Sequence, residues 1–154
     1  MTYNKKVIEK LFTNKLIILE GAEEVAKTSV GKLLVDYLNN NSVETVFTFQ
    51  PGDTTYSPIA TLIRSFCKDK RWNLHPLSQL WAFMFDRTEV LTKVVLPNLK
   101  IGNTVVSDRW SYSTYAYQME GKQLAKEFNI PEDIVSWLSK QIIGKKPDYV
   151  YYFT

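Results

Sequence analysis

The sequence predicts an α/β fold, a three-layer sandwich with a parallel sheet, and three observations support this prediction. Strand and helix patterns alternate four times along the chain. The first strand, Leu16–Leu19, is apolar at every position, as expected for a strand that helices cover on both faces. Glycine or proline marks the turns at the strand ends. We therefore expect a single domain over residues 1–154 with right-handed crossovers.

The bulk composition limits the classes of function. A chain of 154 residues, 45% of them hydrophobic, is long enough to bury a core. Its net charge of +3 is too small to indicate a nucleic-acid or membrane surface, although it suits an anionic small molecule. Cys67 is the only cysteine, so we expect no disulfide framework. We therefore expect a cytoplasmic location, where thiols stay reduced. No apolar run approaches the ~20 residues of a membrane span.

The turn after the first strand resembles a phosphate-binding loop. The pattern G-x-x-x-x-G-K-[ST] presents backbone N–H groups and a lysine to phosphates and a hydroxyl to Mg²⁺. Gly21, Lys27 and Thr28 keep their places in this pattern, whereas Ala26 replaces the second glycine and Glu24 adds a carboxylate. The alternative is an ordinary strand-to-helix turn that contains Lys-Thr. The helix pattern that follows the turn favours the phosphate-binding interpretation.

The remaining elements are indicated by apolar residues at strand or helix spacing between turn residues. Pro97 and Gly102 are expected to break the chain before the third strand. In chain order we expect a short helix or ordered arm over Thr2–Asn14, a helix over Lys27–Asn39, a second strand over Glu44–Phe49, a helix over Ser57–Cys67, a long helix from Pro76 to about Leu96, a third strand over Thr104–Ser107, a helix from Pro131 and a fourth strand over Tyr149–Phe153.

Polar residues follow the second and third strands. The second strand stops at the turn Gln50-Pro51-Gly52-Asp53, and the third ends in Asp108 and Arg109. Parallel sheets bind ligands at the carboxyl ends of their strands. Asp108 is expected to accept a hydrogen bond from Lys27, to orient a water on Mg²⁺ or to align the nucleophile, and Arg109 to neutralise phosphoryl oxygens. The alternative is a local ion pair that caps the next helix.

Two helices carry further candidate binding residues. Phe83 and Arg87 are one helical turn apart and share a face, so that the ring can stack on a base and the guanidinium can bond its edge. The alternative is a core aromatic beside a solvated arginine. Arg64 either meets a phosphate or lies in solvent, and we expect solvent. A later helix carries polar residues whose spacing returns to one side, where they can bind a base or sugar: Ser113, Thr114, Tyr117 and Gln118. The alternative is that the Ser or Thr residues near the helix start only cap the helix.

Taken together, these motifs resemble those of thymidylate kinases, in the P-loop nucleoside monophosphate kinase group, over almost the whole chain from Lys15. The match rests on EGAEEVAKTS for E-G-x-[DE]-G-x-G-K-[ST]-T, TFQPGDT for T-R-E-P-G-G-T, FMFDR for F-A-A-D-R, SDRWSYSTYAYQ for S-D-R-[YH]-x-x-S-x-x-A-Y-Q, and KPDYVYYF for x-P-D-L-T-[FI]-Y-L. Motifs in the same order and spacing argue against chance agreement. The resemblance implies a P-loop nucleoside triphosphate hydrolase-like (nucleotide kinase) fold.

The resemblance further implies transfer of the γ-phosphoryl group of ATP to dTMP, giving dTDP for dTTP biosynthesis, with Mg²⁺ as cofactor. Glu23 is implied near the sugar or acceptor phosphate, and Arg109 between the donor and acceptor phosphates. With Lys27 and Asp108 they form the implied catalytic set. The residues implied at the ATP phosphates are Gly21, Ala26, Lys27, Thr28 and Ser29, with Thr28 and Asp108 serving the metal.

The resemblance also implies a nucleoside pocket and a partner. Phe83 would stack on thymine while Arg87 bonds its edge. The full set implied at dTMP is Pro51, Phe83, Arg87, Arg109, Thr114, Tyr117 and Gln118. Family members commonly form homodimers, for which the apolar residues of Trp81–Leu91 are candidates here. Neither a nucleic acid nor a membrane is an expected partner.

The sequence departs from the family pattern at several places. Phe49 and Gln50 replace the Arg and Glu of T-R-E-P-G-G-T, and Ala26 and Glu24 replace loop glycines. A Cβ or a carboxylate there opposes close phosphate approach. The lid and the last strand of the family are expected to be absent, which makes the fold C-terminally incomplete. Two hypotheses follow: a dTMP kinase without its carboxyl-terminal part, and a catalytically degenerate kinase-fold protein that binds nucleotide or a protein partner without turnover.

Overall fold

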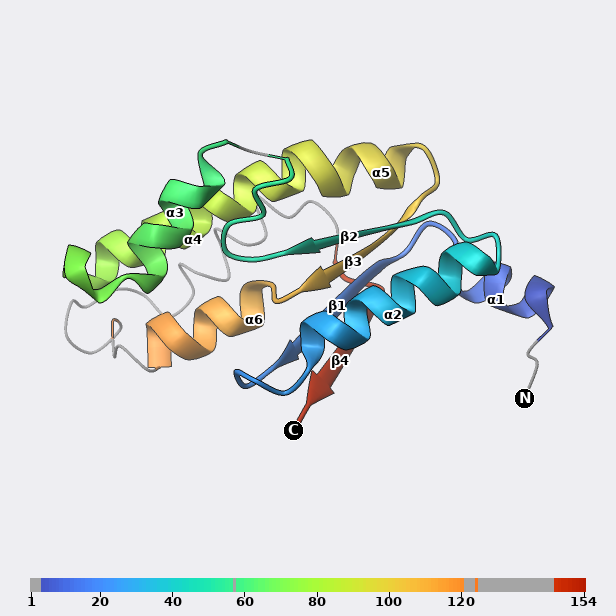
Figure 1. Ribbon diagram of the computed structural model, residues 1–154, viewed down its shortest axis with the longest axis horizontal. Helices are drawn as coiled ribbons and strands as arrows, with labels where there is room; N and C mark the ends of the chain where they lie inside the picture. The colour runs from blue at the N-terminus through green and yellow to red at the C-terminus, as the bar shows by residue number, and fades with distance from the viewer. Residues whose placement is uncertain (1–3, 57, 121–123, 125–145) are drawn as a thin grey trace.

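The computed structural model describes residues 4–56, 58–120, 124 and 146–154, and its centre is a four-stranded parallel sheet (Figure 1). The strands lie in the order β2-β3-β1-β4, and every neighbouring pair is parallel. All four strands therefore end at the same edge. Their bounds are β1 (Leu16–Gly21), β2 (Thr45–Phe49), β3 (Thr104–Asp108) and β4 (Tyr149–Phe153). The predicted α/β fold with a parallel sheet is confirmed.

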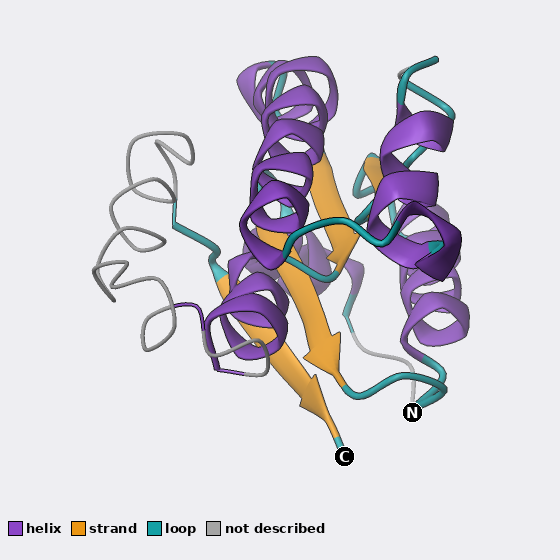
Figure 2. Cartoon of the chain, turned by 90° about the vertical axis from the view of Figure 1, so that its left-hand side faces the viewer, coloured by secondary structure: helices purple, strands orange, loops and turns teal. Residues whose placement is uncertain are grey.

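Helices cover both faces of this sheet, as Figure 2 shows. Among the described residues, the longest helical stretch runs without interruption through three segments, α4, η2 and α5, with a π-helical turn in the middle. The helices are α1 (Lys5–Phe12), α2 (Lys27–Asn40), α3 (Ala60–Lys68), η1 (Lys70–Trp72), α4 (Pro76–Val90), η2 (Leu91–Val95), α5 (Leu96–Lys100), α6 (Ser111–Thr114) and η3 (Tyr115–Glu120).

Alternate side chains of β1 enter two hydrophobic cores, one on each face of the sheet. Leu16 and Ile18 pack with residues of α4, η2 and α5, among them Val94. Ile17 and Leu19 pack on the other face with residues that include those of α1 and α2. All four β1 side chains are buried, as the unbroken apolar run predicts. The two cores hold the ends of β1 and β3 rigidly beside each other.

The predicted element bounds are wrong at two places. The helix expected over Ser57–Cys67 is α3, which begins at Ala60. The long helix does not end near Leu96 and Pro97 does not break it, because the helical stretch continues to Lys100. Pro97 lies in the first turn of α5, directly after the π-helical turn, where the absence of its N–H is tolerated. Gly102, with φ +91°, follows the true end of the helix.

The helix predicted from Pro131 lies outside the described residues. Within the part of the chain that the structure describes, no helix combines the length and the apolar character needed to span a bilayer.

Candidate functional site

Two cavities open at the carboxyl edge of the sheet, where β1, β2 and β3 end. The first has a volume of about 520 Å³ and lies against α4, α6 and η3. The second has a volume of about 660 Å³ and lies over the turn between β1 and α2. Four residues line both cavities and therefore mark their junction, namely Glu23, Gln50, Lys68 and Arg109.

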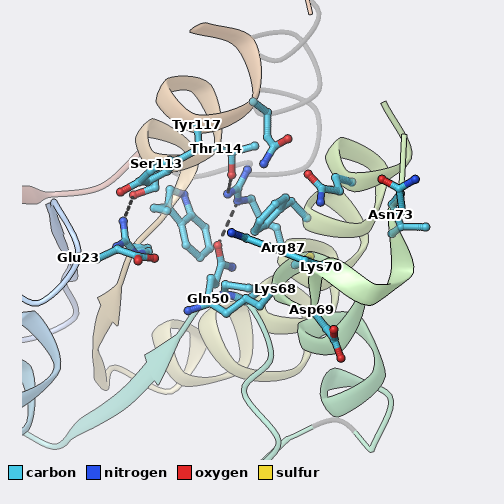
Figure 3. A pocket seen from close by; sticks show the side chains of 18 residues that line it. Glu23, Gln50, Lys68, Asp69, Lys70, Asn73, Arg87, Ser113, Thr114 and Tyr117 are labelled. Carbon is cyan, nitrogen blue, oxygen red and sulfur yellow. Dashed lines mark hydrogen bonds between the residues drawn. The ribbon is translucent and has the colours of Figure 1, made fainter. Parts of the chain in front are cut away.

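The first cavity brings together all the residues that the sequence suggested for a nucleoside (Figure 3). They come from the turn after β2, from α4, from the end of β3 and from the helical segments α6 and η3. The residues are Pro51, Phe83, Arg87, Arg109, Ser113, Thr114, Tyr117 and Gln118. Segments more than sixty positions apart in the chain thus form one wall, because the parallel strands deliver them to the same edge.

Arg87 is the central buried cation of the first cavity. Its side chain is only 1% exposed, so the alternative of a solvated arginine is wrong. Its Nε donates to Gln50 Oε1 at 3.3 Å, and NH2 donates to Thr114 Oγ1 at 2.6 Å. The guanidinium also lies 5.7 Å from the centre of the Trp110 ring. Burial lowers the pKa of Arg87 to about 10, so the side chain remains charged at neutral pH.

Two amide side chains of this cavity keep an unused hydrogen-bonding atom. Gln50 Nε2 and Gln118 Oε1 are buried without a partner among the described residues. Buried polar atoms are normally bonded, so such a donor and acceptor are available to a ligand. With the half-buried ring of Phe83 beside them, the wall combines an aromatic surface with fixed polar groups. A flat heterocycle with donors and acceptors on its edge fits this combination.

The second cavity is formed around the turn that follows β1. Gly21 has φ +141°, and a Cβ on it would lie 2.4 Å from Phe153 O, so only glycine fits. Ala26, immediately before α2, adopts the left-handed conformation with φ +56°, a geometry that glycine prefers. The chain therefore keeps the turn of a phosphate-binding loop despite the alanine. Of the residues predicted for the ATP phosphates, all except Gly21 line the cavity: Ala26, Lys27, Thr28 and Ser29.

Lys27 is buried and folds back on its own loop, where Nζ donates to the carbonyl oxygen of Ala22. Burial lowers the pKa of Lys27, and the nearby Arg109 lowers it further. Because Lys27 donates to Ala22 O and not to Asp108, the suggested hydrogen bond from Lys27 to Asp108 is wrong for this structure. Lys27 and Arg109 instead put two cationic groups beside the same loop, an arrangement that suits an anion.

Asp108 accepts a hydrogen bond from the hydroxyl of Thr28. Its other oxygen, Oδ1, is buried and has no partner within the described part of the chain. A hydroxyl and a carboxylate are hard oxygen ligands of the kind that Mg²⁺ accepts, and Mg²⁺ usually completes its shell with water and phosphate. No cluster of three or more His, Cys, Asp or Glu ligands occurs among the residues that the structure covers. These two residues fit an ion that is shared with a bound phosphate.

Arg109 closes the junction between the cavities. Its NH1 donates to Gly21 O at 3.1 Å and to Ser113 Oγ at 3.0 Å, and its guanidinium lies 5.4 Å from the centre of the Tyr117 ring. It forms no ion pair with Asp108 in the described structure, so the alternative of a local capping pair is wrong. The guanidinium faces both cavities, with the exposed Glu23 on the same junction.

Sequence reasoning missed the role of two residues. Arg64 does not extend into solvent as expected: NH1 donates to Pro51 O at 2.7 Å, and the guanidinium lies 5.7 Å from the centre of the Phe49 ring. Glu20 is buried and accepts from the backbone N–H of Trp110 at 2.9 Å and from the hydroxyl of Ser113. Its position just before Gly21 in the first motif was the available signal for a functional group.

The comparisons with known proteins agree on one family. A family model described as thymidylate kinase matches residues 19–154. A thymidylate kinase of Legionella pneumophila (strain Paris) is 31% identical over 142 residues, which are 91% of this chain and 63% of the relative. A thymidylate kinase of Brachyspira hyodysenteriae is 33% identical over 79% of this chain and 58% of its own length. The chain thus spans less than two thirds of the curated relatives that it matches.

Solved structures give the same result. The crystal structure of thymidylate kinase from Ehrlichia chaffeensis superposes with a TM-score of 0.78 at 27% identity, covering 92% of this chain and 72% of that one. The structure of thymidylate kinase from Candida albicans superposes with a TM-score of 0.67 at 21% identity and supports the fold alone. It covers 91% of this chain and 62% of the Candida chain.

Proposed function

Since this chain belongs to the thymidylate kinase family, we propose that it catalyses transfer of the γ-phosphoryl group from ATP to dTMP. The observation that carries the proposal is the junction of the two cavities at Arg109. One cavity offers an aromatic ring and unused amide groups to a base, and the other offers a phosphate-binding turn. A nucleoside monophosphate in the first cavity would direct its phosphate toward a nucleotide held in the second.

In this proposal the first cavity selects the acceptor. Phe83 stacks on thymine, while Arg87 and Gln118 hydrogen-bond its polar edge. Gln50 and Thr114 hold Arg87 in place through the hydrogen bonds described above. A fixed guanidinium loses little freedom when it binds, which favours selective recognition of one base. Tyr117 and Pro51 complete the walls around the sugar.

The second cavity orients the donor. Backbone N–H groups of the turn, together with Lys27 and Ser29, hold the ATP phosphates. Thr28 and Asp108 would hold Mg²⁺, which when bound neutralises charge on the phosphates. An oxygen of the dTMP phosphate attacks the γ-phosphorus in line, the bond from that phosphorus to the β,γ-bridging oxygen breaks, and ADP leaves. Arg109 stabilises the charge that spreads over the transferred oxygens, and Glu23 orients the acceptor near them.

A coupled assay of ADP release tests this proposal. The chain is supplied with ATP, Mg²⁺ and, in separate reactions, each common deoxynucleoside monophosphate. ADP release that requires Mg²⁺ and is fastest with dTMP is the expected result. Release that is equally fast without any acceptor would contradict it.

The second candidate is a protein that binds nucleotide without turnover. Ala26 and Glu24, both at positive φ in the phosphate turn, favour it, because side chains there crowd an approaching phosphate. The same assay distinguishes the two candidates when dTMP binding is measured by calorimetry. No ADP release, together with dTMP binding that Phe83→Ala abolishes, would select the binding protein.

The remaining expectations from the resemblance are also proposals. We place residues 1–154 in one P-loop kinase domain of a cytoplasmic protein that acts on dTMP and ATP and on neither nucleic acid nor membrane. We propose a homodimer in which α4 contributes Trp81 and Phe85, which are one turn apart and 49% and 48% exposed. Light scattering of the wild type beside Trp81→Glu tests the dimer: the variant is expected to be monomeric.

A further inference from the structure

The junction of the two cavities contains a lysine to which neither the family motifs nor the comparisons give a role. Lys68 is the last residue of α3 and lines both cavities together with Glu23, Gln50 and Arg109. Figure 3 shows its side chain lying beside Gln50 in the wall of the first cavity. The sequence alone carries no signal for a role of Lys68, because the residue belongs to none of the motifs.

Arg109, the other cation at the junction, and two cations that line only the second cavity, Lys27 and Arg64, are already engaged. Arg109 donates to Gly21 O and Ser113 Oγ, and Lys27 donates to Ala22 O. Arg64, one helical turn before Lys68, is held by Pro51 O and the ring of Phe49. Within the described residues the side chain of Lys68 forms no hydrogen bond or ion pair, and it is exposed. Its ammonium group is therefore available to a ligand.

Two other lysines line the cavities without a partner in the described structure, but each reaches only one of them. Lys32 lines the second cavity and Lys70 the first. Lys68 alone among these three lies where the cavities meet. An acceptor phosphate has to occupy that meeting point, because its nucleoside fills the first cavity and its reacting oxygen faces the second.

The local charge makes a free cation important. Glu23 and Asp108 place two carboxylates near the junction, and Phe49 gives the end of β2 an apolar ring. A phosphate monoester brings a charge of about −2 near pH 7, so it needs cations close to its oxygens. The ammonium group of Lys68 is a compact charge on a flexible stem and can follow the phosphate into place.

We propose that Lys68 binds the acceptor phosphate at the junction of the two cavities. The inference rests on the proposed function, since it takes a thymidine monophosphate as the occupant of the first cavity. Lys68 hydrogen-bonds a non-attacking phosphate oxygen and, together with Arg109, neutralises part of its charge. Phe49, at the end of β2, replaces the arginine of the family motif T-R-E-P-G-G-T and carries no charge. Lys68 supplies a positive charge from the end of α3 instead.

Calorimetric titration of the whole chain with dTMP and with thymidine tests this role. Lys68→Gln is expected to weaken dTMP binding by about three- to tenfold, as suits one charged contact in a partly exposed site. Thymidine, which has no phosphate, is expected to bind wild type and variant equally. Lys68→Arg should restore most of the dTMP affinity. Lys100→Gln is the matched control, because Lys100 is also an exposed lysine in the last turn of a helix.

Two results would overturn the role of Lys68. One is equal dTMP affinity of the wild type and Lys68→Gln. The other is a loss of thymidine affinity as large as the loss of dTMP affinity, which would mean that Lys68 shapes the nucleoside wall instead. Both leave the proposed function standing, because the wild type binds dTMP in each. A wild type that binds neither ligand would remove the proposed function and this inference with it.

Discussion

The hydroxyl of Thr28 donates a hydrogen bond to the carboxylate of Asp108, which joins the first turn of α2 to the end of β3. These residues are eighty positions apart in the chain. They meet because β1 and β3 are adjacent parallel strands, with Leu19 in register with Asp108. The hydrogen bond thus connects the phosphate-binding turn to the strand that Arg109 directly follows.

Asp108→Asn tests the importance of this pair. The amide can still accept from Thr28, but it removes the negative charge that suits Mg²⁺. We expect ADP release to fall by about 10²–10³-fold, as when a preorganised electrostatic group is removed, and the Mg²⁺ requirement to shift to higher concentration. Asp36→Asn, an exposed carboxylate on α2, is the control and should retain full activity. Unchanged Mg²⁺ dependence in Asp108→Asn would contradict the assignment.

Arg87→Lys should weaken both acceptor binding and the fold. Lysine keeps the charge but cannot reach Gln50 and Thr114 together as the guanidinium does. Leaving buried acceptors unpaired costs about 1–3 kcal/mol in the free energy of unfolding. Urea denaturation measures this loss, and calorimetry should record at least about tenfold weaker dTMP binding. Arg71→Lys, at an exposed pair with Asp69, is the control and should leave both values unchanged.

A buried carboxylate should make stability depend on pH. Asp86 is 2% exposed, and burial, aided by the charge of Asp53, raises its pKa to about 6 although Gly52 N donates to it. A carboxyl whose pKa is higher in the folded state stabilises the fold below pH ~4, and this stabilisation is lost as pH rises through about 6. The shift of about two units corresponds to at most about 3 kcal/mol.

Asp86→Asn should remove this pH dependence, because the amide does not ionise and its oxygen can still accept from Gly52. Urea titrations at pH 4 and pH 7 measure the effect. Between pH 4 and pH 7, the free energy of unfolding of the variant should rise by about 1–3 kcal/mol relative to that of the wild type. The same difference between the two proteins at both pH values would show that folding does not raise the pKa of Asp86.

Much of the fold was predictable because strong local signals agreed with one another. The apolar run of β1, the turn chemistry after β2 and the repeated strand–helix alternation all indicated one parallel sheet. Pro97 misled the prediction because its effect depends on the π-helical turn before it, which no local spacing reveals. The start of α3 was misplaced for a similar reason, since Pro58 is compatible with the first turn of a helix but does not require it.

The candidate site was predictable where a residue belongs to a motif. Phe83, Arg87 and Gln118 all fall in such segments and all line the first cavity. Arg64 and Lys68 belong to no motif. Their surroundings depend on how α3 packs against the turn after β2, a tertiary contact that the spacing of residues along the chain does not encode.

Cys67 should be slow to react with alkylating reagents. It lines the first cavity as a half-buried thiol, and burial, reinforced by the charge of Asp86, raises its pKa to about 12. The thiolate is the reactive form, so alkylation by iodoacetamide at pH 8 should be at least about tenfold slower than for an exposed cysteine. Mass spectrometry gives the rate, and the same chain in urea is the reference, where normal reactivity should return. Equal rates in both states would contradict the buried environment.

Ala26→Gly should improve the phosphate-binding turn. Ala26 holds φ +56°, a conformation that costs an L residue about 1 kcal/mol and glycine almost nothing. The variant should therefore be as stable as the wild type or up to about 1 kcal/mol more stable, and the lost Cβ should let phosphate oxygens approach the backbone. Urea denaturation and calorimetry with ATP measure the two effects.

Ala22→Gly is the matched control, because Ala22 belongs to the same turn but is not among its residues at positive φ. That control should only lose stability, by about 0.5–1 kcal/mol, through the greater freedom of the unfolded chain. Tighter ATP binding in Ala26→Gly but not in Ala22→Gly would locate the obstacle at one methyl group, whereas equal affinity in all three proteins would mean that Ala26 does not limit phosphate approach.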